Sequence, residues 1–215
     1  PGQPSAPGGQ PASPAMPHNR GRALICLALA AGLHAWAVAP VGQDDMSFPQ
    51  RREHLSGYDG WDVRGRIAVN TGTGAFQGRF HWRETGESLE LAIRGPLGTG
   101  ILEVAGPQNE LTVRARGETF ELDDPEAELS ALLGWWLPVR SLSTWLLGLP
   151  DPAFPSVTSL GPDNALLSLE QRLWQITYQS YRLADGVLLP RRIDMAHRDL
   201  ELRIVVDRWQ SITGQ

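Results

Sequence analysis

The chain contains no lysine, and its single cysteine, Cys26, lies in the N-terminal segment. All 19 basic residues are therefore arginines, which we attribute to the base composition of the genome rather than to function. From residue 44 onward the sequence has no thiol, so this part of the chain forms neither a disulfide bond nor a cysteine metal site. Its stability must come from packing alone.

An excess of positive charge and the common catalytic motifs are also missing. The formal net charge is −5 at pH 7, and because nucleic acids are bound through a basic field, no nucleic acid is expected as a partner. The sequence has neither the G-x-S-x-G of an esterase nor the H-E-x-x-H of a zinc site. His54, His81 and His197 do not have the spacing of metal ligands. We therefore expect no enzyme, no metal and no cofactor.

The N-terminal part differs in composition from the rest. Residues 1–15 are rich in Pro, Gly, Ser and Ala, which predicts a disordered or non-native leader. Residues 16–39 have a basic start followed by an apolar run, the order typical of a signal peptide or an N-terminal anchor segment. The run is shorter than the roughly 20 residues of a membrane-spanning helix. Residues 44–212 are predicted to form one domain.

From Trp61 onward, apolar and polar residues alternate with a period of two. One face of each such segment is apolar, and the other carries mainly charged and amide residues. Connections rich in Gly, Thr, Asn and Pro separate the segments, as in antiparallel hairpins. The pattern predicts nine to eleven antiparallel strands, found in 61–70, 76–83, 89–94, 111–116, 174–179, 193–196, 200–207 and shorter runs between them.

Three segments have helical signals. Ser47 and Gln50 fit a capping box before a short helix that stops at Gly57. Residues 124–134 begin with Asp-Pro and end in Gly, and residues 137–148 carry apolar side chains at helical spacing. Because a long sheet with one dry face tends to curl, we expect a barrel or half-barrel with the later helices covering its mouth.

The dry face is rich in large aromatic side chains, and the chain has eight tryptophans in all. Such a face is either an ordinary packed core or the wall of an apolar cavity. An acyl chain gains about 0.8 kcal/mol per buried methylene, so a cavity of this kind would suit lipid. The candidate lining residues, chosen because they lie on dry faces, are Phe80, Trp82, Leu91, Ile93, Trp145, Leu146, Trp174, Tyr178 and Met195.

Four segments carry a more specific pattern: GWDVRGRIAV, FQGRFHWRETGESLELAIRGPLGTGILEVAG, LLGWWLPVRSLSTWLLGLP and DLELRIVVDRW. In this order and spacing they resemble the LolB family, the outer-membrane lipoprotein receptors of Gram-negative bacteria. The resemblance runs from about residue 55 to residue 209. Its most specific pieces are the Pro-Leu-Gly turn after a strand and the block from Gly134 to Pro150.

The resemblance implies a fold and a function. The fold would be mainly β: an antiparallel, unclosed half-barrel of about eleven strands with helices covering the mouth. The protein would act as a monomer at the periplasmic face of the outer membrane. It would accept lipoproteins from a LolA-type periplasmic carrier, hold their acyl chains in the hydrophobic cavity and insert them into the inner leaflet, without a nucleotide or another cofactor.

The same resemblance gives a role to an apolar residue at the tip of a turn. In the family a loop between strands projects such a residue, and the matching positions here are Pro96, Leu97 and Gly98. We expect Leu97 to touch the bilayer surface and to help lipid leave the cavity. From the residues alone, a leucine folded back over the core or simply exposed explains the turn equally well.

The sequence departs from the family pattern at the lipid anchor. Family members usually carry a Leu-Ala-Gly-Cys lipobox, but here Leu29-Ala30-Ala31-Gly32 is followed by Leu33. Acylation is therefore in doubt, and cleavage or retention of the apolar segment are the alternatives.

Two further questions stay open at this stage. The first is whether the ligand is instead a free lipid or glycolipid, bound without any protein client. The second concerns several arginines on the wet faces, which either meet lipid headgroups or an acidic partner or are simply solvated. They are Arg64, Arg66, Arg79, Arg114 and Arg116.

Overall fold

The computed structural model describes residues 45–98, 100–198 and 200–212. The predictions for the leader 1–15, the segment 16–39 and the lipobox position Leu33 lie outside the described residues. The helices are α1 (Phe48–Ser56), the 3-10 helix η1 (Pro96–Gly98), α2 (Pro125–Leu133) and α3 (Val139–Leu146). The strands are β1 (Gly60–Asn70), β2 (Ala75–Thr85), β3 (Ser88–Arg94), β4 (Gly100–Pro107), β5 (Leu111–Ala115), β6 (Glu118–Leu122), β7 (Ser156–Leu160), β8 (Leu166–Gln171), β9 (Trp174–Ala184), β10 (Val187–His197) and β11 (Leu200–Ile212).

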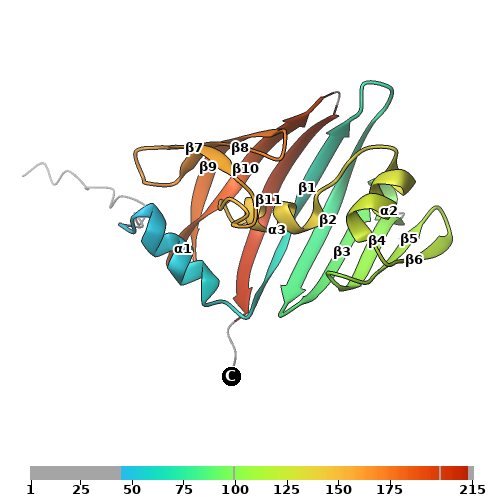
Figure 1. Ribbon diagram of the computed structural model, residues 1–215, viewed down its shortest axis with the longest axis horizontal. Helices are drawn as coiled ribbons and strands as arrows, with labels where there is room; N and C mark the ends of the chain where they lie inside the picture. Colours follow the sequence, from blue (N-terminus) through green and yellow to red (C-terminus); the bar gives the residue numbers. More distant parts are fainter. Residues whose placement is uncertain (1–44, 99, 199, 213–215) are drawn as a thin grey trace, which may run out of the picture. The chain divides into compact units, whose positions relative to one another are not determined.

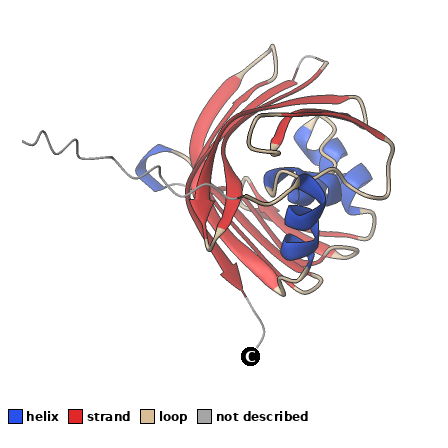
Figure 2. Ribbon diagram, turned by 90° about the vertical axis from the view of Figure 1, so that its left-hand side faces the viewer, coloured by secondary structure: helices blue, strands red, loops and turns tan. Residues whose placement is uncertain are grey.

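The eleven strands form one antiparallel sheet in the order β6-β5-β4-β3-β2-β1-β11-β10-β9-β8-β7. Strands β6 and β7 are its two edges, and the sheet curls around α2 and α3 without closing (Figures 1 and 2). The predicted mainly β, unclosed half-barrel of about eleven strands, with helices over its mouth, is confirmed.

The period-two pattern accounts for the curl, because each strand has a dry face and a wet face. In β3, for example, Leu89, Leu91 and Ile93 are buried, whereas Glu90 and Arg94 are exposed. The dry faces of all the long strands turn toward the helices and form one continuous core with them. Apolar burial on this concave side is the main source of stability, as expected for a domain without disulfide bonds.

Gly65 lies at an irregularity in the pairing of β1 with β11. The β1–β11 register shifts between Arg64 and Gly65, which is the signature of a β-bulge. A Cβ at Gly65 would lie 2.2 Å from the carbonyl oxygen of Val205, so no side chain fits there. Glycine at this position therefore lets β1 and β11 approach closely.

The two helices over the sheet begin and end where their sequence signals predict. Asp124 caps α2 by accepting a hydrogen bond from the backbone N–H of Ala127 at 3.4 Å, and Pro125 occupies the first turn. Gly134 ends α2 in the left-handed conformation with φ of 80°, and Gly148 does the same just after α3 with φ of 77°.

Helix α1 is attached to the sheet by a buried arginine. Its capping box of Ser47 and Gln50 is present, and Leu55 enters the core. The guanidinium of Arg51 donates hydrogen bonds to the carbonyl oxygens of Asn164 at 2.7 Å and Asp163 at 3.2 Å. These carbonyls belong to the β7–β8 turn, so α1 is held to the β7 end of the sheet.

Candidate functional site

An apolar cavity of about 400 Å³ lies between α2, α3 and the concave face of the sheet. Its wall comes from the inner faces of β1 to β4 and β11, and its roof from α2, α3 and the loop that joins them. Thr71 and Arg116 contribute the polar atoms near its rim. A volume in this range is typical of pockets that enclose a small molecule.

The size of the cavity limits what it can hold in this conformation. If a methylene needs about the 30 Å³ that a water molecule occupies in the liquid, the space corresponds to roughly 13 such groups. That is close to one acyl chain and well short of two or three. A cargo with several chains would therefore require the roof to move.

Five of the nine residues predicted to line a lipid cavity do line this one. Phe80 and Trp82 come from β2, Leu91 and Ile93 from β3, and Leu146 from α3. All five are buried, and the alternation of β2 and β3 points the four strand residues to the same side of the sheet.

The other four predicted residues lie elsewhere in the core. Trp145, Trp174, Tyr178 and Met195 are each at most 3% exposed and have no surface on the cavity. Their position is explained by packing: the indole rings of Trp145 and Trp174 lie 6.0 Å apart, and the Tyr178 hydroxyl donates to the carbonyl oxygen of Trp145 at 2.9 Å. Trp145, Trp174 and Tyr178 thus join α3 to β9.

A buried glutamine completes this attachment. The Trp145 indole N–H donates to Oε1 of Gln171 at 2.7 Å. The side-chain amide of Gln171 in turn donates to the carbonyl oxygens of Asp151 and Phe154, both at 2.8 Å. Since the polar side-chain atoms of Trp145 and Gln171 are paired, burial of this indole and this amide costs little, whereas the buried indole N–H of Trp174 has no hydrogen-bond partner among the described residues.

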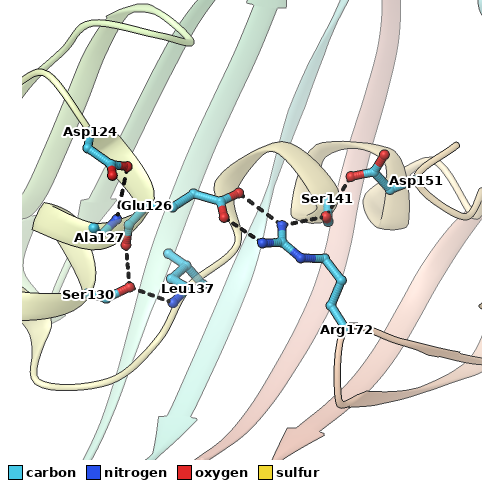
Figure 3. Close-up of polar contacts among 8 residues, drawn as sticks. All are labelled: Asp124, Glu126, Ala127, Ser130, Leu137, Ser141, Asp151 and Arg172. Carbon is cyan, nitrogen blue, oxygen red and sulfur yellow. Dashed lines mark hydrogen bonds and ion pairs between the residues drawn. The ribbon is translucent and has the colours of Figure 1, made fainter. Parts of the chain in front are cut away.

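Arg172 links the two roof helices to the β8–β9 turn (Figure 3). Its guanidinium makes a two-point contact with Glu126 of α2, at 3.0 and 2.7 Å, and donates to the hydroxyl of Ser141 in α3 at 3.0 Å. The Ser141 hydroxyl donates to Asp151 at 2.6 Å. We call these four residues the Arg172 network.

Two aromatic rings pack against the guanidinium of Arg172. The guanidinium carbon lies 4.8 Å from the ring centroid of Trp136 and 4.2 Å from that of Phe154. Cation–π contacts of this kind strengthen a charge pair that is only partly hydrated. The roof is thus held by a charged contact at one side of the mouth.

Glu84, on the inner face of β2, is a second charged group under α3. It accepts hydrogen bonds from the Trp82 indole at 3.1 Å and from the Ser143 hydroxyl at 2.7 Å. Burial raises the pKa of Glu84 above the usual carboxyl value, and the two hydrogen bonds oppose that shift. The carboxyl group therefore ties β2 to α3 in a way that depends on pH.

Several residues of the cavity were not among those selected from the sequence. Ile67, Phe76 and Ile204 share the dry-face periodicity, so the pattern that gave the other lining residues could have found them. Ile101 and Leu102 belong to β4, whose alternation is weaker. The roof residues follow no strand period and depend on tertiary packing; they are Leu132, Leu133, Trp135, Leu137 and Leu142.

The Pro-Leu-Gly turn forms η1, between β3 and β4. Pro96 and Gly98 border a groove whose other lining residues include exposed arginines of the outer face of the sheet. Gly98 closes the turn with φ of 79° and donates its N–H to the carbonyl oxygen of Gly95 at 3.2 Å. The side chain of Leu97 lies outside the described part of the structure, so its predicted contact with a bilayer stays a prediction.

The described residues offer little for catalysis. Within residues 45–98, 100–198 and 200–212, no three His, Cys, Asp or Glu side chains are close enough to hold a metal ion. The buried serines Ser141 and Ser143 donate to carboxylates rather than to a histidine. His197 lies instead against aromatic rings, with its centroid 5.3 Å from that of Trp174.

The same described ranges contain no helix that is both long and apolar enough to cross a membrane.

Comparison with known proteins shows that the sequence is similar to the outer-membrane lipoproteins named LolB. The family model described as "Outer membrane lipoprotein LolB" matches residues 59–209. The outer-membrane lipoprotein LolB of Nitrosococcus oceani is 36% identical over 174 residues, which cover 80% of this chain and 87% of the relative. That of Stutzerimonas stutzeri is 33% identical over 165 residues, covering 76% and 80%. A solved LolA superfamily protein from Nitrosomonas europaea aligns with a TM-score of 0.49 and 11% identity, over 80% of this chain and 90% of that one.

Proposed function

The chain belongs to the family of the outer-membrane lipoprotein LolB, and from that premise we propose that it receives lipoproteins at the outer membrane by burying their acyl chains in the apolar cavity. The observation that carries the proposal is the apolar cavity beneath α2 and α3. A filled core would leave an acyl chain no place to go.

The proposed partner is a LolA-type periplasmic carrier, and the proposed destination is the inner leaflet of the outer membrane. The chain would act there as a monomer and without a cofactor. Because no energy source takes part, the transfer would be an equilibrium that follows the relative affinity of each site for the acyl chains. The role proposed is binding and transfer rather than catalysis.

The direct test mixes the chain with a carrier already loaded with lipoprotein and then separates the two proteins. We expect the lipoprotein to move onto this chain. Retention of the lipoprotein on the carrier would contradict the proposal. If purified protein instead holds an extractable free lipid and exchanges nothing with the carrier, the alternative of a free-lipid or glycolipid binding protein is favoured.

A second test addresses delivery. We propose that Leu97, flanked by Pro96 and Gly98, contacts the bilayer surface. The Leu97→Glu variant should fold and still accept lipoprotein, because Pro96 and Gly98 of η1 line the outer groove and are not among the residues that line the cavity. It should fail to release lipoprotein into vesicles, since a charged side chain is poorly accommodated among acyl chains. Normal delivery by this variant would remove the role given to the turn.

A further inference from the structure

The outer face of the sheet carries three arginines in one row across three neighbouring strands. The register places Arg66 of β1 directly opposite Arg79 of β2, and Arg79 directly opposite Arg94 of β3. All three side chains are exposed. We call these three residues the arginine row; with strands about 4.8 Å apart, it spans about 10 Å.

This arrangement is unfavourable for the isolated protein. Side chains directly opposite one another on neighbouring strands lie within about 5.5 Å at Cβ, and like charges there repel. Arg66 lies 3.1 Å from Asp207, and Arg94 lies 3.9 Å from Glu103. For Arg79, between them, no carboxylate within ion-pair distance exists among the described residues.

The arginine row faces a wide, shallow groove of about 1,320 Å³. Arg64 and Arg203 also line it, and Asp207 contributes the one lining carboxylate. Small and aliphatic residues line the groove between the arginines. They include Gly65, Ala68, Gly78, Ala92 and Val205.

The sign of this surface is opposite to that of the chain as a whole. The formal net charge of the protein is −5, yet arginines dominate the groove. Guanidinium groups match phosphate oxygens well, because each can donate two parallel hydrogen bonds. Charge complementarity therefore points to an anionic phosphate surface.

The position of the groove beside η1 favours a membrane as the source of the phosphate groups. Pro96 and Gly98 of η1 line the same groove as the arginines, and Arg94 is the last residue of β3 before that turn. In a bilayer the phosphate groups lie directly above the apolar acyl chains. An apolar turn beside a row of arginines matches these two layers, with the arginines at the phosphates and the turn at the acyl chains.

We propose that the arginine row is a docking surface for the phosphate groups of a phospholipid bilayer, and that it orients η1 toward the membrane. The inference depends on the proposed function only in that the chain works at a membrane. It does not depend on the cavity or on its cargo.

The experiment measures sedimentation of the full chain with vesicles of phosphatidylethanolamine and phosphatidylglycerol, and with vesicles of phosphatidylcholine alone. The test protein is the triple variant R66Q/R79Q/R94Q. The matched control, R52Q/R114Q/R208Q, removes the same charge from exposed positions outside the groove. Transfer of lipoprotein from a carrier in solution, without vesicles, is measured in parallel as an independent readout of the cavity.

Each arginine near an anionic surface contributes about fivefold to binding, so the triple variant should bind phosphatidylglycerol vesicles on the order of 100-fold more weakly. The control should lose less than about threefold, and both variants should take up lipoprotein normally. Wild-type binding should also weaken as salt is raised. The thermal midpoint of the triple variant should be unchanged or higher, because like-charge repulsion is removed.

Four results would overturn the inference. They are absence of wild-type binding to the anionic vesicles, full binding by the triple variant, equal losses in the triple variant and the control, and lost transfer from the carrier with vesicle binding intact. The last would make the row a protein-docking surface. None of the first three would affect the proposed cavity function, which fails only if uptake in solution fails in the wild type.

Discussion

The inner face of β2 and β3 lines the cavity of about 400 Å³, whereas no residue of β9 or β10 is among its lining residues. Both faces are apolar and both carry large aromatic side chains. The difference is in their polar contacts with α3. On the β9 side, Trp145 and Tyr178 make hydrogen bonds that join α3 to the sheet.

The comparison teaches how an apolar space persists in a protein core. Helix α3 is fixed on the β9 side by these hydrogen bonds, and Glu84 gives it a single charged contact with β2. The side chains that line the cavity beside β2 and β3 are mostly aliphatic or phenylalanine. Such side chains form no hydrogen bonds that would hold α3 against the sheet. A void therefore remains on one side because the other side determines where the helix lies.

The largest effect on stability is expected from a substitution on the β9 side, where α3 packs against the sheet. Trp145→Ala should lower the free energy of unfolding by about 3–5 kcal/mol, since it removes a fully buried ring. Phe80→Ala, beside the cavity, should cost about 2 kcal/mol, because that ring already faces empty space. Chemical denaturation of both variants gives the comparison. Equal losses would mean that the two sides are packed alike.

The next effect concerns the Arg172 network, which holds the roof. Arg172→Met keeps an apolar stem against Trp136 and Phe154 but removes the contact with Glu126. Because this pair is mostly buried, the expected loss is about 2 kcal/mol, between the values for buried and surface pairs. Hydrogen exchange in α2 should become faster.

A matched control for that variant is Arg192→Met, which removes an exposed ion pair with Asp194 at 3.8 Å. It should change stability by less than about 0.5 kcal/mol. If Arg172→Met behaved like this control, the roof would not depend on the network.

A smaller effect, on ligand binding, is expected from a substitution that fills part of the cavity beside β2 and β3. Leu91→Trp adds bulk inside the cavity and should displace about two methylenes of a bound acyl chain, which weakens binding roughly 15-fold at about 0.8 kcal/mol each. Titration with a fluorescent fatty acid measures this change in binding affinity. Leu167→Trp, at an exposed position on β8, should bind as the wild type does. Undiminished binding by Leu91→Trp would place the ligand elsewhere.

The smallest effect is a change in the pH dependence of stability through Glu84. Burial raises the pKa of Glu84 in the folded state, so its contribution to stability is fully present below the usual carboxyl pKa and is lost as pH rises through the raised value. Glu84→Gln cannot titrate. The wild type should therefore lose stability relative to Glu84→Gln between about pH 4 and neutrality. A constant difference over this range would show that the carboxyl group is not desolvated.

Most of the fold follows from local patterns in the sequence. Alternation identifies the strands, and the signals at Asp124, Gly134 and Gly148 set the ends of the roof helices. These features are local, because a strand face or a helix cap depends on a few neighbouring residues. The pattern predicts nine to eleven strands rather than a single number, because short strands such as β6 and β7 contain too few residues to show a clear alternation.

The site could be predicted only in part, for a physical reason. Periodicity shows which side of a strand is dry, but Phe80 and Tyr178 have the same dry-face signature and only Phe80 meets the cavity. What separates them is whether α3 reaches the sheet, which depends on contacts between Trp145 and Gln171, far apart in the sequence. The partnership of Arg172 with Glu126 is equally non-local.

The two free edges of the sheet give it a mechanical freedom. In a closed barrel the diameter is fixed by strand number and stagger, so a larger guest would have to break ladder hydrogen bonds. Here β6 and β7 can move apart while every pair of hydrogen-bonded strands stays intact. If the proposed function holds, the capacity for cargo would depend on the curvature of the sheet, and a bulky cargo would need the sheet to flex rather than to unfold.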